Sequence, residues 1–557
     1  MSAEQLITQH INTWTSALQT RSTAGRGNNG KIDVYGIKKL RELILELAVR
    51  GKLVPQDPND EPASELLKRI AAEKADLVKQ GKIKKQKPLP EISEDEKPFK
   101  LPEGWEWVRL GTLGYTQTGG TPSKSNSEYF GNDIPFIKPA DITAQGVIYD
   151  NEGLSIKGRD SLGRLAPSGS ILMVCIGTIG KCQIINRTCS FNQQINSITP
   201  LANIADFIYL DVSSSYFQSL AWDNSSSTTI AILNKGKWES LLVPMAPLSE
   251  QARIVTNVKK LMSLCDQLEQ QSLTSLEAHS QLVETLLATL TNSQNAEELA
   301  ENWARISQHF DTLFTTETSI DALKQSILQL AVMGKLVPQD PSDEPASELL
   351  KRIEQEKAQL VEEGKIKKGK AFTKMADKNK HTLPNGWIKC HLGDVIAISS
   401  GDGLTLKQMD SDGKIPVYGG NGITGYHNEW NIQKPTIVIG RVGYYCGSIH
   451  ITPSLAWVTD NAFRTFHSTS NIDIKFLSIL LKGTNLKENE NATAQPVISA
   501  SKIYPISIML PPLNEQKRIF KKFNELISFC EALKSSLHSA QQTQLHLADA
   551  LTDAALS

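Results

Sequence analysis

The chain has 557 residues, of which 40% are hydrophobic and 21% charged, and its formal net charge at pH 7 is −1. A chain of this length is long enough for about three or four domains, each with its own hydrophobic core. The near-zero net charge does not indicate a polyanion-binding protein, and no apolar run approaches the roughly 18–20 residues of a membrane span, which argues against a membrane protein.

The N-terminal residues lack the basic start and the apolar core of a signal peptide. The seven cysteines are an odd number and include no Cys-x-x-Cys pair, a pattern that favours reduced thiols. Together these features predict a cytoplasmic location.

Residues 1–95 are predicted to be a helical region. Apolar residues at helical spacing indicate one helix within residues 1–20 and another over residues 37–49, with a polar, glycine-rich linker between them. A third helix is expected over about residues 60–79, because a proline fits its first turn and acidic residues lie near its N-terminus.

Residues 96–248 differ in composition and are predicted to form a first β-rich globular domain. The segment opens at Leu101-Pro-Glu-Gly-Trp105 and is rich in glycine, asparagine, serine and β-branched residues. Short apolar runs between turns, such as residues 135–138 and 170–176, are typical of strands.

A long helix is expected to open a central helical region over residues 249–380. Its apolar residues alternate in steps of four and three, which is the a/d seam of a coiled coil. A C-terminal helical region over residues 513–557 repeats these steps. The seam residues are Ile254, Val258, Leu261, Cys265 and Leu268, and Ile519, Phe523, Leu526, Cys530 and Leu533. Each seam is expected to pack on the other, although amphipathic helices packed on their own globular domains would show the same pattern.

A second β-rich globular domain is predicted over residues 381–512. It opens at Leu383-Pro-Asn-Gly-Trp387, which repeats the opening of the first domain. It closes at Pro512-Leu-Asn-Glu-Gln-Lys-Arg-Ile519, which repeats Pro247-Leu-Ser-Glu-Gln-Ala-Arg-Ile254. Both globular domains are therefore expected to share one plan.

Twenty residues occur twice with almost no change. Residues 51–70 return as residues 334–353, an offset of 283 (334 − 51), and only Asn59 and Ser342 differ. So long a period excludes a solenoid, whose units have roughly 20–50 residues. The expected fold is of the α/β or α+β class, with two β-rich globular domains separated by two long-helix spacer regions. The arrangement is expected to be pseudo-two-fold and circular.

No convincing catalytic constellation is present in the sequence. It has no complete phosphate-binding loop, no His-Glu-x-x-His, no Gly-x-Ser-x-Gly and no Cys/His cluster with metal-ligand spacing. Cys175, Cys182 and Cys189 lie in strand-like sequence, where core thiols are expected. The acidic residues within 57–61 and 340–344 could imitate a metal site, but their place beside helix N-termini favours capping. The chain is therefore predicted not to be an enzyme and to hold no metal.

Polar, glycine-rich loops are the feature of the globular domains that points to a ligand. Asn, Gln, Arg and Lys side chains read the base edges of DNA, and glycines let backbone amides approach phosphates. Such loops are also common as plain turns. The candidate DNA-binding residues are Thr121, Ser123, Lys124, Lys138, Thr178, Lys181, Asn192, Gln193 and Gln194 in the first domain, and Gly401, Tyr418, Asn421, Arg441, Asp460, Asn461 and Gln495 in the second.

Several paired motifs resemble the specificity subunit of type I restriction-modification systems. They are the repeated Leu-Ala-Val-x-Gly-Lys-Leu-Val-Pro-Gln-Asp-Pro, the Leu-Pro-x-Gly-Trp pair and the Pro-Leu-x-Glu-Gln-x-Arg-Ile pair. Tyr418-Gly-Gly-Asn-Gly422 and Thr459-Asp-Asn-Ala-Phe463 are also typical of the target recognition domains of that family. The resemblance covers essentially the whole chain and includes the order, spacing and duplication of the motifs.

The resemblance implies that each globular domain is a target recognition domain that reads one half of a split, asymmetric site in double-stranded DNA. It implies that the helical regions form an antiparallel coiled coil that sets the gap between the halves. Two adenine-N6 methyltransferase subunits and two restriction–translocase subunits are the expected partners. S-adenosylmethionine would belong to the first of these, ATP and magnesium to the second, and no cofactor to this chain. The expected partner-binding residues are Lys52, Leu53, Val54 and Pro55, and Lys335, Leu336, Val337 and Pro338.

Two other classes of function are weighed against this one. A duplicated scaffold could grip proteins without sequence-specific DNA readout. A self-contained methyltransferase is disfavoured, because the sequence lacks a cofactor-binding glycine loop after a strand and an Asn/Asp-Pro-Pro-aromatic motif. Residues 101–248 hold 10 basic and 12 acidic residues, and residues 383–512 hold 10 and 9. The isolated chain is therefore expected to bind DNA weakly.

Overall fold

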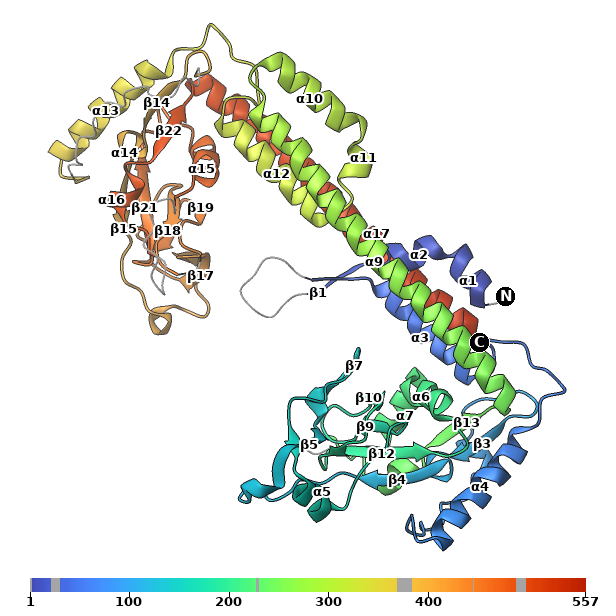
Figure 1. The fold of residues 1–557 in the computed structure, drawn as a ribbon. Helices are drawn as coiled ribbons and strands as arrows, with labels where there is room; N and C mark the ends of the chain where they lie inside the picture. The colour runs from blue at the N-terminus through green and yellow to red at the C-terminus, as the bar shows by residue number, and fades with distance from the viewer. Residues whose placement is uncertain are drawn as a thin grey trace. The chain divides into compact units, whose positions relative to one another are not determined.

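The computed structural model describes residues 3–21, 31–226, 230–367, 383–443, 445–486 and 497–556 (Figure 1). The chain falls into two compact units. Unit 1 comprises Met1–Ser275 and Ala540–Ser557, and unit 2 comprises Leu276–Ser539. Two long helices, α9 (Leu248–Asn292) and α17 (Leu513–Leu556), contribute residues to both units.

Unit 1 combines helices with short strands. Its own helices are α1 (Ala3–Gln9), α2 (Ile11–Ser16), α3 (Tyr35–Val49), α4 (Ala63–Lys79), α5 (Ile156–Leu162), α6 (Ala205–Ser213), α7 (Ser215–Asp223) and α8 (Lys235–Glu239). Its strands are β1 (Gln19–Arg21), β2 (Lys31–Asp33), β3 (Glu106–Arg109), β4 (Gly114–Thr118), β5 (Phe130–Ile137), β6 (Ile142–Thr143), β7 (Gly146–Val147), β8 (Gly153–Leu154), β9 (Ile171–Val174), β10 (Cys182–Ile184), β11 (Ser190–Phe191), β12 (Ile195–Pro200) and β13 (Leu242–Met245).

The described strands of unit 1 build two larger sheets and three two-stranded pairs, β1-β2, β6-β7 and β13-β3. One sheet is antiparallel with the order β10-β9-β12-β4, and the other has the order β11-β5-β8. In the second sheet β11 pairs in parallel with β5. The first and last strands of the globular part, β3 and β13, pair with each other in antiparallel fashion. The two ends of the globular part therefore lie together, where it joins the helices.

Unit 2 has its own set of elements. Its helices are α10 (Ala296–Gln308), α11 (Phe310–Leu313), α12 (Glu317–Val332), α13 (Ala346–Glu362), α14 (Leu392–Val395), α15 (Ile474–Gly483) and α16 (Ala500–Ile503). Its strands are β14 (Ile388–His391), β15 (Ile396–Ser400), β16 (Ile415–Gly419), β17 (Gly422–His427), β18 (Ile437–Gly440), β19 (Ile449–Ile451), β20 (Trp457–Val458), β21 (Ala462–His467) and β22 (Ser507–Leu510).

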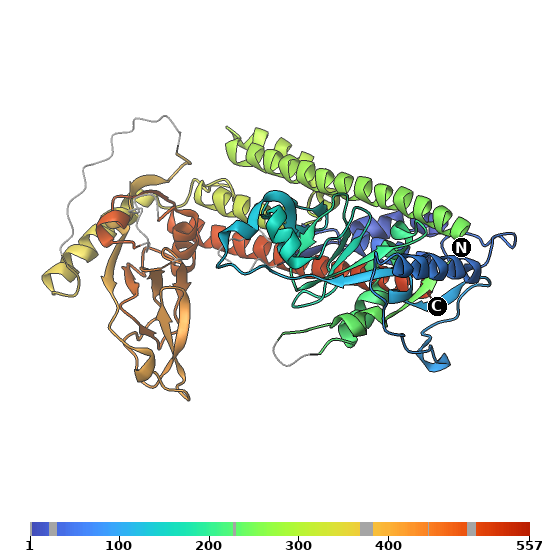
Figure 2. The ribbon, with the colours of Figure 1, turned by 60° about the horizontal axis from the view of Figure 1, so that its bottom comes forward.

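The sheets of unit 2 repeat the plan of unit 1. The orders are β19-β18-β21-β15 and β17-β16-β20, and β14 pairs with β22 as β3 does with β13. The parallel contact also recurs, between β16 and β20. In both views α13 lies beside the globular part of its own unit (Figure 1; Figure 2). The expected fold class, two β-rich globular parts combined with long helices, is confirmed.

Burial explains why the central strands form. All four residues of β9 are buried, as are all four of β18. Continuous apolar runs of this length suit strands that are covered on both faces. The side chains of these strands enter the main core of each unit and the small cluster on the other face of the sheet.

The N-terminal region differs in one respect from the expected all-helical segment. The short strands β1 and β2 pair in antiparallel fashion between α2 and α3. Residues 22–30, where the glycine-rich linker was expected, lie outside the described residues. Helix α3 ends where expected, because Gly51 takes a left-handed φ of +66°.

In unit 1 the α9 seam packs on α3. All five seam residues share a buried cluster with the apolar face of α3 and with Ala548 of α17. Arg41 of α3 pairs with Asp266 and Glu269 of α9, each at 2.6 Å. At the far side of α3, the Tyr35 hydroxyl donates to Asp549 of α17 at 2.7 Å.

In unit 2 the α17 seam packs on α12 in the same manner. Cys530 lies in a buried cluster with apolar residues of α12 and of the second half of α9, while Phe523, Leu526 and Leu533 pack against that cluster. Ile519 enters the core of the globular part. Lys324 of α12 pairs with Glu531 of α17 at 2.5 Å.

The prediction that the two seams pack on each other is therefore wrong. Each seam belongs to a different unit and meets a short helix, α3 or α12, together with the later part of the other long helix. Within each unit the α9 and α17 segments run antiparallel. The heptad pattern showed which face is buried but not which helix covers it.

None of the described helices combines the length and the apolar character that a membrane crossing requires. The division into five segments, at residues 95, 248, 380 and 512, stays a prediction.

Candidate nucleic-acid interface and a duplicated joint

The candidate loops of unit 1 lie at one edge of its sheets. Residues 119–124 follow β4, residues 138–141 follow β5, residues 177–181 follow β9, and residues 191–194 lead into β12. Strands β9, β12 and β4 are neighbours in one sheet, and β5 pairs with β11 immediately before the last loop. The sheet order therefore gathers four loops that are far apart in the sequence.

Backbone hydrogen bonds hold these loops in a frame. Four bonds of 2.8–3.0 Å, written donor first, join Gly119 to Ile195, Gly120 to Phe191, Asn192 to Ile137 and Cys175 to Gln194. A Cβ atom on Gly119 would lie 2.0 Å from the Asn192 carbonyl oxygen. Glycine is thus required at position 119, because the backbones approach too closely for any side chain.

Unit 2 contains the same frame. Its four equivalent bonds, of 2.9–3.1 Å, join Gly401 to Ala462, Asp402 to Val458, Thr459 to Tyr418 and Arg441 to Asn461. A Cβ atom on Gly401 would lie 2.2 Å from the Val458 carbonyl oxygen. The frame is therefore conserved between the units bond for bond, although the side chains at these positions differ.

Six candidate side chains of unit 1 are exposed on the frame: those of Thr121, Ser123, Lys124, Thr178, Lys181 and Gln193. The Thr121 hydroxyl donates to the side-chain carbonyl of Gln193 at 2.6 Å and so joins two loops. Ser123 shares a hydrogen bond of 2.8 Å with Ser125.

The two candidate lysines that follow β5 and β9 are engaged inside the unit. Lys138 forms an ion pair with Glu152. Lys181 donates to the Pro139 carbonyl at 3.0 Å, which links the two loops. A contact with a ligand would require either lysine to exchange its present partner.

In unit 2, Arg441 occupies the centre of the frame. Its guanidinium lies 3.3 Å from the Ser400 hydroxyl oxygen, 3.4 Å from the Asp460 carbonyl oxygen and 5.4 Å from the centre of the Phe463 ring. Its Nε is buried and has no hydrogen-bond partner among the described residues. The side chains of Asn421, Asp460 and Asn461 are exposed around it.

The structure corrects two candidates. The side chains of Asn192 and Tyr418 are only 6% and 7% exposed. Asn192 donates to Gln194 at 3.0 Å and Tyr418 is part of a core cluster, so both support the loops from beneath. Burial also raises the pKa of the Tyr418 hydroxyl. Gln495 lies outside the described residues.

Two arginines that the sequence did not single out also belong to the frame. Arg164 donates to the Thr118 carbonyl at 2.9 Å, and Arg464 donates to the Ser400 carbonyl at 2.8 Å. These carbonyls end the equivalent strands β4 and β15. The two arginines come from non-equivalent places in the chain, so neither the repeat nor a motif could have revealed them.

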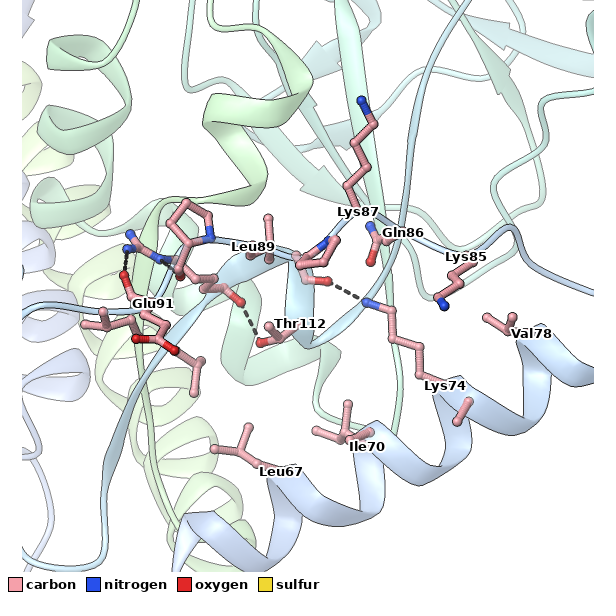
Figure 3. Close-up of a pocket in the computed structure, with 18 of the residues that line it drawn as sticks. Leu67, Ile70, Lys74, Val78, Lys85, Gln86, Lys87, Leu89, Glu91 and Thr112 are labelled. Atoms are coloured by element: carbon pink, nitrogen blue, oxygen red, sulfur yellow. Dashed lines mark hydrogen bonds between the residues drawn. The ribbon is translucent and has the colours of Figure 1, made fainter.

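A lysine on the helix that begins within each repeated block is half-buried in both units. Lys74 donates to the Gly111 carbonyl at 2.6 Å, beside a groove of about 760 Å³ between α4 and residues 85–92 (Figure 3). Lys357 donates to the Ile396 carbonyl at 3.1 Å. Burial lowers the pKa of Lys74 to about 8 and lowers that of Lys357 as well. Both lysines attach their helix to the globular part.

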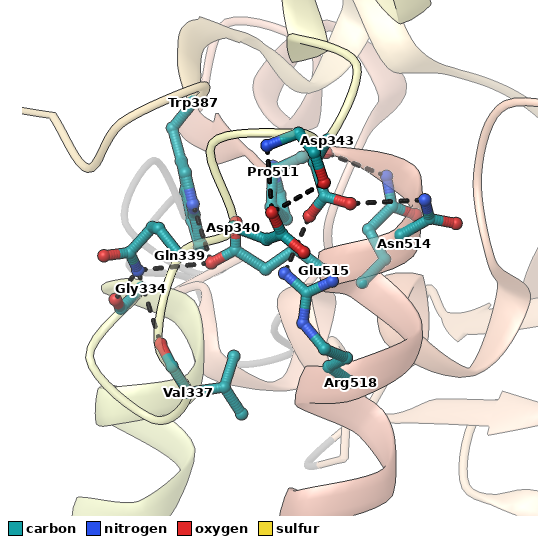
Figure 4. Close-up of polar contacts among 12 residues, drawn as sticks. Gly334, Val337, Gln339, Asp340, Asp343, Trp387, Pro511, Asn514, Glu515 and Arg518 are labelled. Atoms are coloured by element: carbon teal, nitrogen blue, oxygen red, sulfur yellow. Dashed lines mark hydrogen bonds and ion pairs between the residues drawn. The ribbon is translucent and has the colours of Figure 1, made fainter.

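The repeated block forms a joint with the opening and closing motifs of each globular part. In unit 2 the Trp387 indole donates to Glu515 at 3.0 Å, and the Gln339 amide donates both to Glu515 at 3.3 Å and to the Gly334 carbonyl at 2.8 Å (Figure 4). Arg518 pairs with Asp343 at 2.7 Å. The first turn of α17 is thereby fixed to the block that precedes α13.

Unit 1 has an equivalent joint. The Trp105 indole donates to Glu250 at 3.0 Å and the Gln56 amide donates to the same carboxylate at 3.1 Å. Arg253 pairs with Asp60 at 2.6 Å. Glu250 is 1% exposed, and its burial raises the pKa of its carboxyl while the two hydrogen bonds oppose that rise. The acidic residues of the block are thus used in ion pairs and turns. The expected helix capping is not found, because the N-termini of α4 and α13 have no side-chain cap hydrogen bond.

Each joint also holds the end of a long helix. The Lys52 ammonium donates to the carbonyl of Leu556, the last residue of α17, at 2.9 Å. The equivalent Lys335 donates to the carbonyls of Thr291 and Ser293, at the end of α9, both at 2.8 Å. A cation at a helix C-terminus also offsets the helix dipole.

The repeated block was expected to be a partner-binding surface, and its residues have internal contacts instead. Leu53 is buried, and Val54, Leu336 and Val337 are half-buried. Among the eight expected partner-binding residues, Pro55 and Pro338 are exposed. Lys52 is also exposed, and its ammonium caps α17. Docking of a partner on this block stays a prediction.

The cysteines behave as core residues. All seven are free, and burial raises the pKa of Cys175 and Cys189 to about 12 and that of Cys182 to about 11. Thiols with such pKa values are protonated at neutral pH and are poor nucleophiles. Across the described part of the chain, no group of His, Cys, Asp and Glu side chains is arranged to hold a metal ion.

Comparisons with known proteins agree with this picture. The family model described as the type I restriction modification DNA specificity domain matches residues 102–278 and 384–540. The EcoEI specificity subunit of Escherichia coli, a type I restriction enzyme subunit, is 46% identical over 599 residues, and the EcoAI specificity subunit of Escherichia coli is 47% identical over 600 residues. Both alignments cover 100% of this chain and 100% of the relative. The HindI specificity subunit of Haemophilus influenzae is 33% identical over 175 residues, which are 29% of this chain and 37% of that protein.

Proposed function

Because this chain belongs to the family of type I restriction-modification DNA specificity subunits, we propose that each of its globular parts reads one half of a bipartite, asymmetric DNA site. The observation that carries the proposal is the duplicated loop frame. One frame with two different sets of side chains is what recognition of two different half-sites requires. Each frame presents exposed polar side chains on a backbone that glycines and backbone hydrogen bonds hold in place.

The frame suits direct reading of base edges. Gln193 and Asp460 occupy equivalent positions, the first an amide and the second a carboxylate. An amide side chain pairs with adenine through two bonds, whereas a carboxylate accepts from cytosine. Different bases at equivalent places in the two half-sites would follow from this difference.

Phosphate contacts supply much of the affinity of DNA-binding proteins. The globular parts offer little excess positive charge, with 10 basic and 12 acidic residues in 101–248 and 10 and 9 in 383–512. We therefore propose that two adenine-N6 methyltransferase subunits complete the grip on DNA, and that two restriction–translocase subunits join that assembly. S-adenosylmethionine would bind to the first partner, and ATP and magnesium to the second, with none on this chain.

A pair of matched variants tests the reading of half-sites. Gln193→Ala and Asp460→Ala change equivalent positions of the two frames. Sequencing of methylated adenines, in cells that carry the complete system, should show that each variant relaxes or shifts one half of the methylated motif and leaves the other half unchanged. Lys68→Gln, on the exposed side of α4, serves as the control and should leave both halves unchanged. If either variant altered both halves together, the assignment of one half-site to each globular part would be wrong.

The helical regions are proposed to set the gap between the half-sites. One helical turn rises about 5.4 Å, and one base pair of DNA rises about 3.4 Å. Insertion of four residues into one long helix should therefore lengthen the gap of the methylated motif by about one to two base pairs. Retention of the original gap by an active insertion variant would contradict this role.

A further inference from the structure

A run of lysines follows α4 and is repeated after α13. In unit 1 this lysine strip comprises residues 82–87, of which Lys82, Lys84, Lys85 and Lys87 are basic and none is acidic. Residues 365–370 repeat the four lysines at an offset of 283 (365 − 82). Residues 368–370 lie outside the described residues, so the structural argument rests on unit 1 and on residues 365–367.

The backbone of the lysine strip is held in place by its uncharged residues. Gly81 ends α4 with a φ of +69°, and the amides of Lys82 and Ile83 donate to the Leu77 carbonyl at 3.0 and 3.4 Å. Ile83 is half-buried. The second copy repeats these two bonds, from Lys365 and Ile366 to Leu360, at 2.9 and 3.3 Å.

Gln86 attaches the strip to the globular part. Its side-chain amide donates to the Thr116 hydroxyl and to the Glu239 carboxylate, both at 2.9 Å. Thr116 lies in β4, two residues before the end of that strand. The strip therefore crosses the strand that leads directly into the loop at residues 119–124.

The four lysine side chains point to solvent. All are exposed, and none takes part in a hydrogen bond or an ion pair with the residues that the structure describes between 31 and 226. Lys74 differs, because its ammonium is turned to the Gly111 carbonyl, while Lys85 and Lys87 extend to either side of Gln86 (Figure 3). A plain linker does not need a fixed backbone to carry its charges. This strip has a fixed backbone and carries four unpaired cations, which is unusual for a linker.

The strip lies within electrostatic reach of the loop frame. Strand residues rise about 3.3 Å each, so the three steps from Thr116 to Gly119 span about 10 Å. That distance is close to the Debye length of about 10 Å at 0.1 M salt. The positive charge of the strip would therefore attract a duplex held against the loops. The phosphates of the duplex lie at intervals that lysine side chains can bridge.

We propose that the lysine strip of residues 82–87 binds phosphate groups of the DNA duplex whose bases the loop frame of unit 1 reads. The proposal rests on the proposed function of the loop frames. It locates positive charge that the globular parts themselves lack, and it places this charge beside one half-site, because Gln86 ties the strip to the globular part of unit 1. A polyanion fits such a strip better than a protein surface does, because the strip offers four cations and almost no exposed apolar surface.

The test uses a double variant that combines Lys84→Gln and Lys85→Gln in one chain. Its control is a second double variant that removes the same amount of charge elsewhere. The control combines Lys68→Gln and Lys259→Gln, whose side chains are 72% and 70% exposed and lie on α4 and α9. Each chain is purified in complex with its partner subunits. Affinity is measured across a range of salt concentrations for two duplexes, one with the methylated motif and one with a scrambled sequence.

Loss of two phosphate contacts should lower the slope of log affinity against log salt by about 1.8, since each contact contributes about 0.9. The expected result is this reduced slope for both duplexes with an unchanged methylated motif, and an unchanged slope for the control. An unchanged slope in the strip variant would overturn the proposal, as would loss of complex assembly with normal DNA binding, which would assign the strip to an acidic protein partner. A wild-type complex without a defined methylated motif would instead refute the proposed function of the loop frames.

Discussion

The buried carboxylate of each joint allows a quantitative prediction. In unit 1, Trp105→Phe removes the indole N–H that lies 3.0 Å from Glu250 and keeps most of the apolar ring. Hydrogen bonds to charged groups contribute about 1.5–3 kcal/mol. Glu250 is 1% exposed, so water cannot replace the lost donor and no reduction for solvent screening applies. We expect Trp105→Phe to cost about 1.5–3 kcal/mol at pH 8 through this bond alone.

The cost should depend on pH. Burial already holds the pKa of Glu250 above its ordinary value, and the Trp105 hydrogen bond opposes that rise. Removal of the bond raises the pKa further, so the ionised carboxylate is less stable in the folded state than before. The added cost is therefore absent at a pH where Glu250 is protonated in both the folded and the unfolded state. It develops as the pH rises through the pKa of Glu250 in the folded protein, which burial holds above the ordinary glutamate value of about 4.3.

Hydrogen exchange measured by mass spectrometry can resolve this effect, because peptides from the first turn of α9 report on the unit 1 joint alone. Trp387→Phe provides an internal replicate, since its bond to Glu515 is also 3.0 Å. Trp107→Phe is the control, because Trp107 is 9% exposed and its contacts are aromatic rings. Equal losses of protection at pH 4.5 and pH 8 for Trp105→Phe would refute the reasoning, as would an equally pH-dependent loss for Trp107→Phe.

Three further predictions follow from the same contacts. Gly51→Ala should destabilise unit 1 by about 1–3 kcal/mol more than Gly81→Ala, because both glycines have left-handed φ but only at Gly51 would a Cβ meet another atom, Pro102 Cγ at 2.4 Å; thermal unfolding of the two variants checks this. Lys335→Met should cost about 1 kcal/mol and speed hydrogen exchange in the last turn of α9, whose carbonyls Lys335 binds; unchanged exchange there would exclude a capping role. Amine labelling of Lys74 should rise with a midpoint near pH 8, because burial lowers the pKa of this lysine; a midpoint near the ordinary lysine value of about 10.4 would contradict that burial.

The duplication made much of the fold predictable. The identity of residues 51–70 with 334–353 required two similar halves, and the paired motifs marked where each globular part begins and ends. The seam pattern located the buried faces of the long helices. The seam pattern could not show which helix covers each seam. A heptad pattern records only that a face is buried, and α3 and α12 present equally apolar faces.

The candidate site was predictable only in part. Thr121 and Gly401 belong to loops that the structure gathers into one frame in each unit, yet each frame depends on backbone bonds between residues that are distant in the sequence. Asn192 and Tyr418 were chosen by residue type and prove to be buried, because composition does not reveal which side of a loop faces solvent. Arg164 and Arg464 were missed because they lie at non-equivalent positions of the chain, although the backbone carbonyls to which they donate are equivalent.

The near-identity of the repeated block has a second physical cause besides a shared partner surface. The structure uses Gln56, Asp60 and their copies for bonds within each unit. Identical internal geometry constrains a sequence as strongly as an identical partner does. The distinction required knowledge of where the opposite groups, Glu250 and Glu515, lie in space.

The pairing of β3 with β13 has a consequence for the exchange of a whole globular part between related chains. The two strands place residues 106–109 and 242–245 side by side, so the chain leaves each globular part where it entered. A gene segment that encodes the region between them can be exchanged by recombination as one cassette, and the joint outside it needs no compensating change. Such an exchange would replace the side chains of the loop frame and leave the bonds of Trp105 and Arg253 in the joint in place.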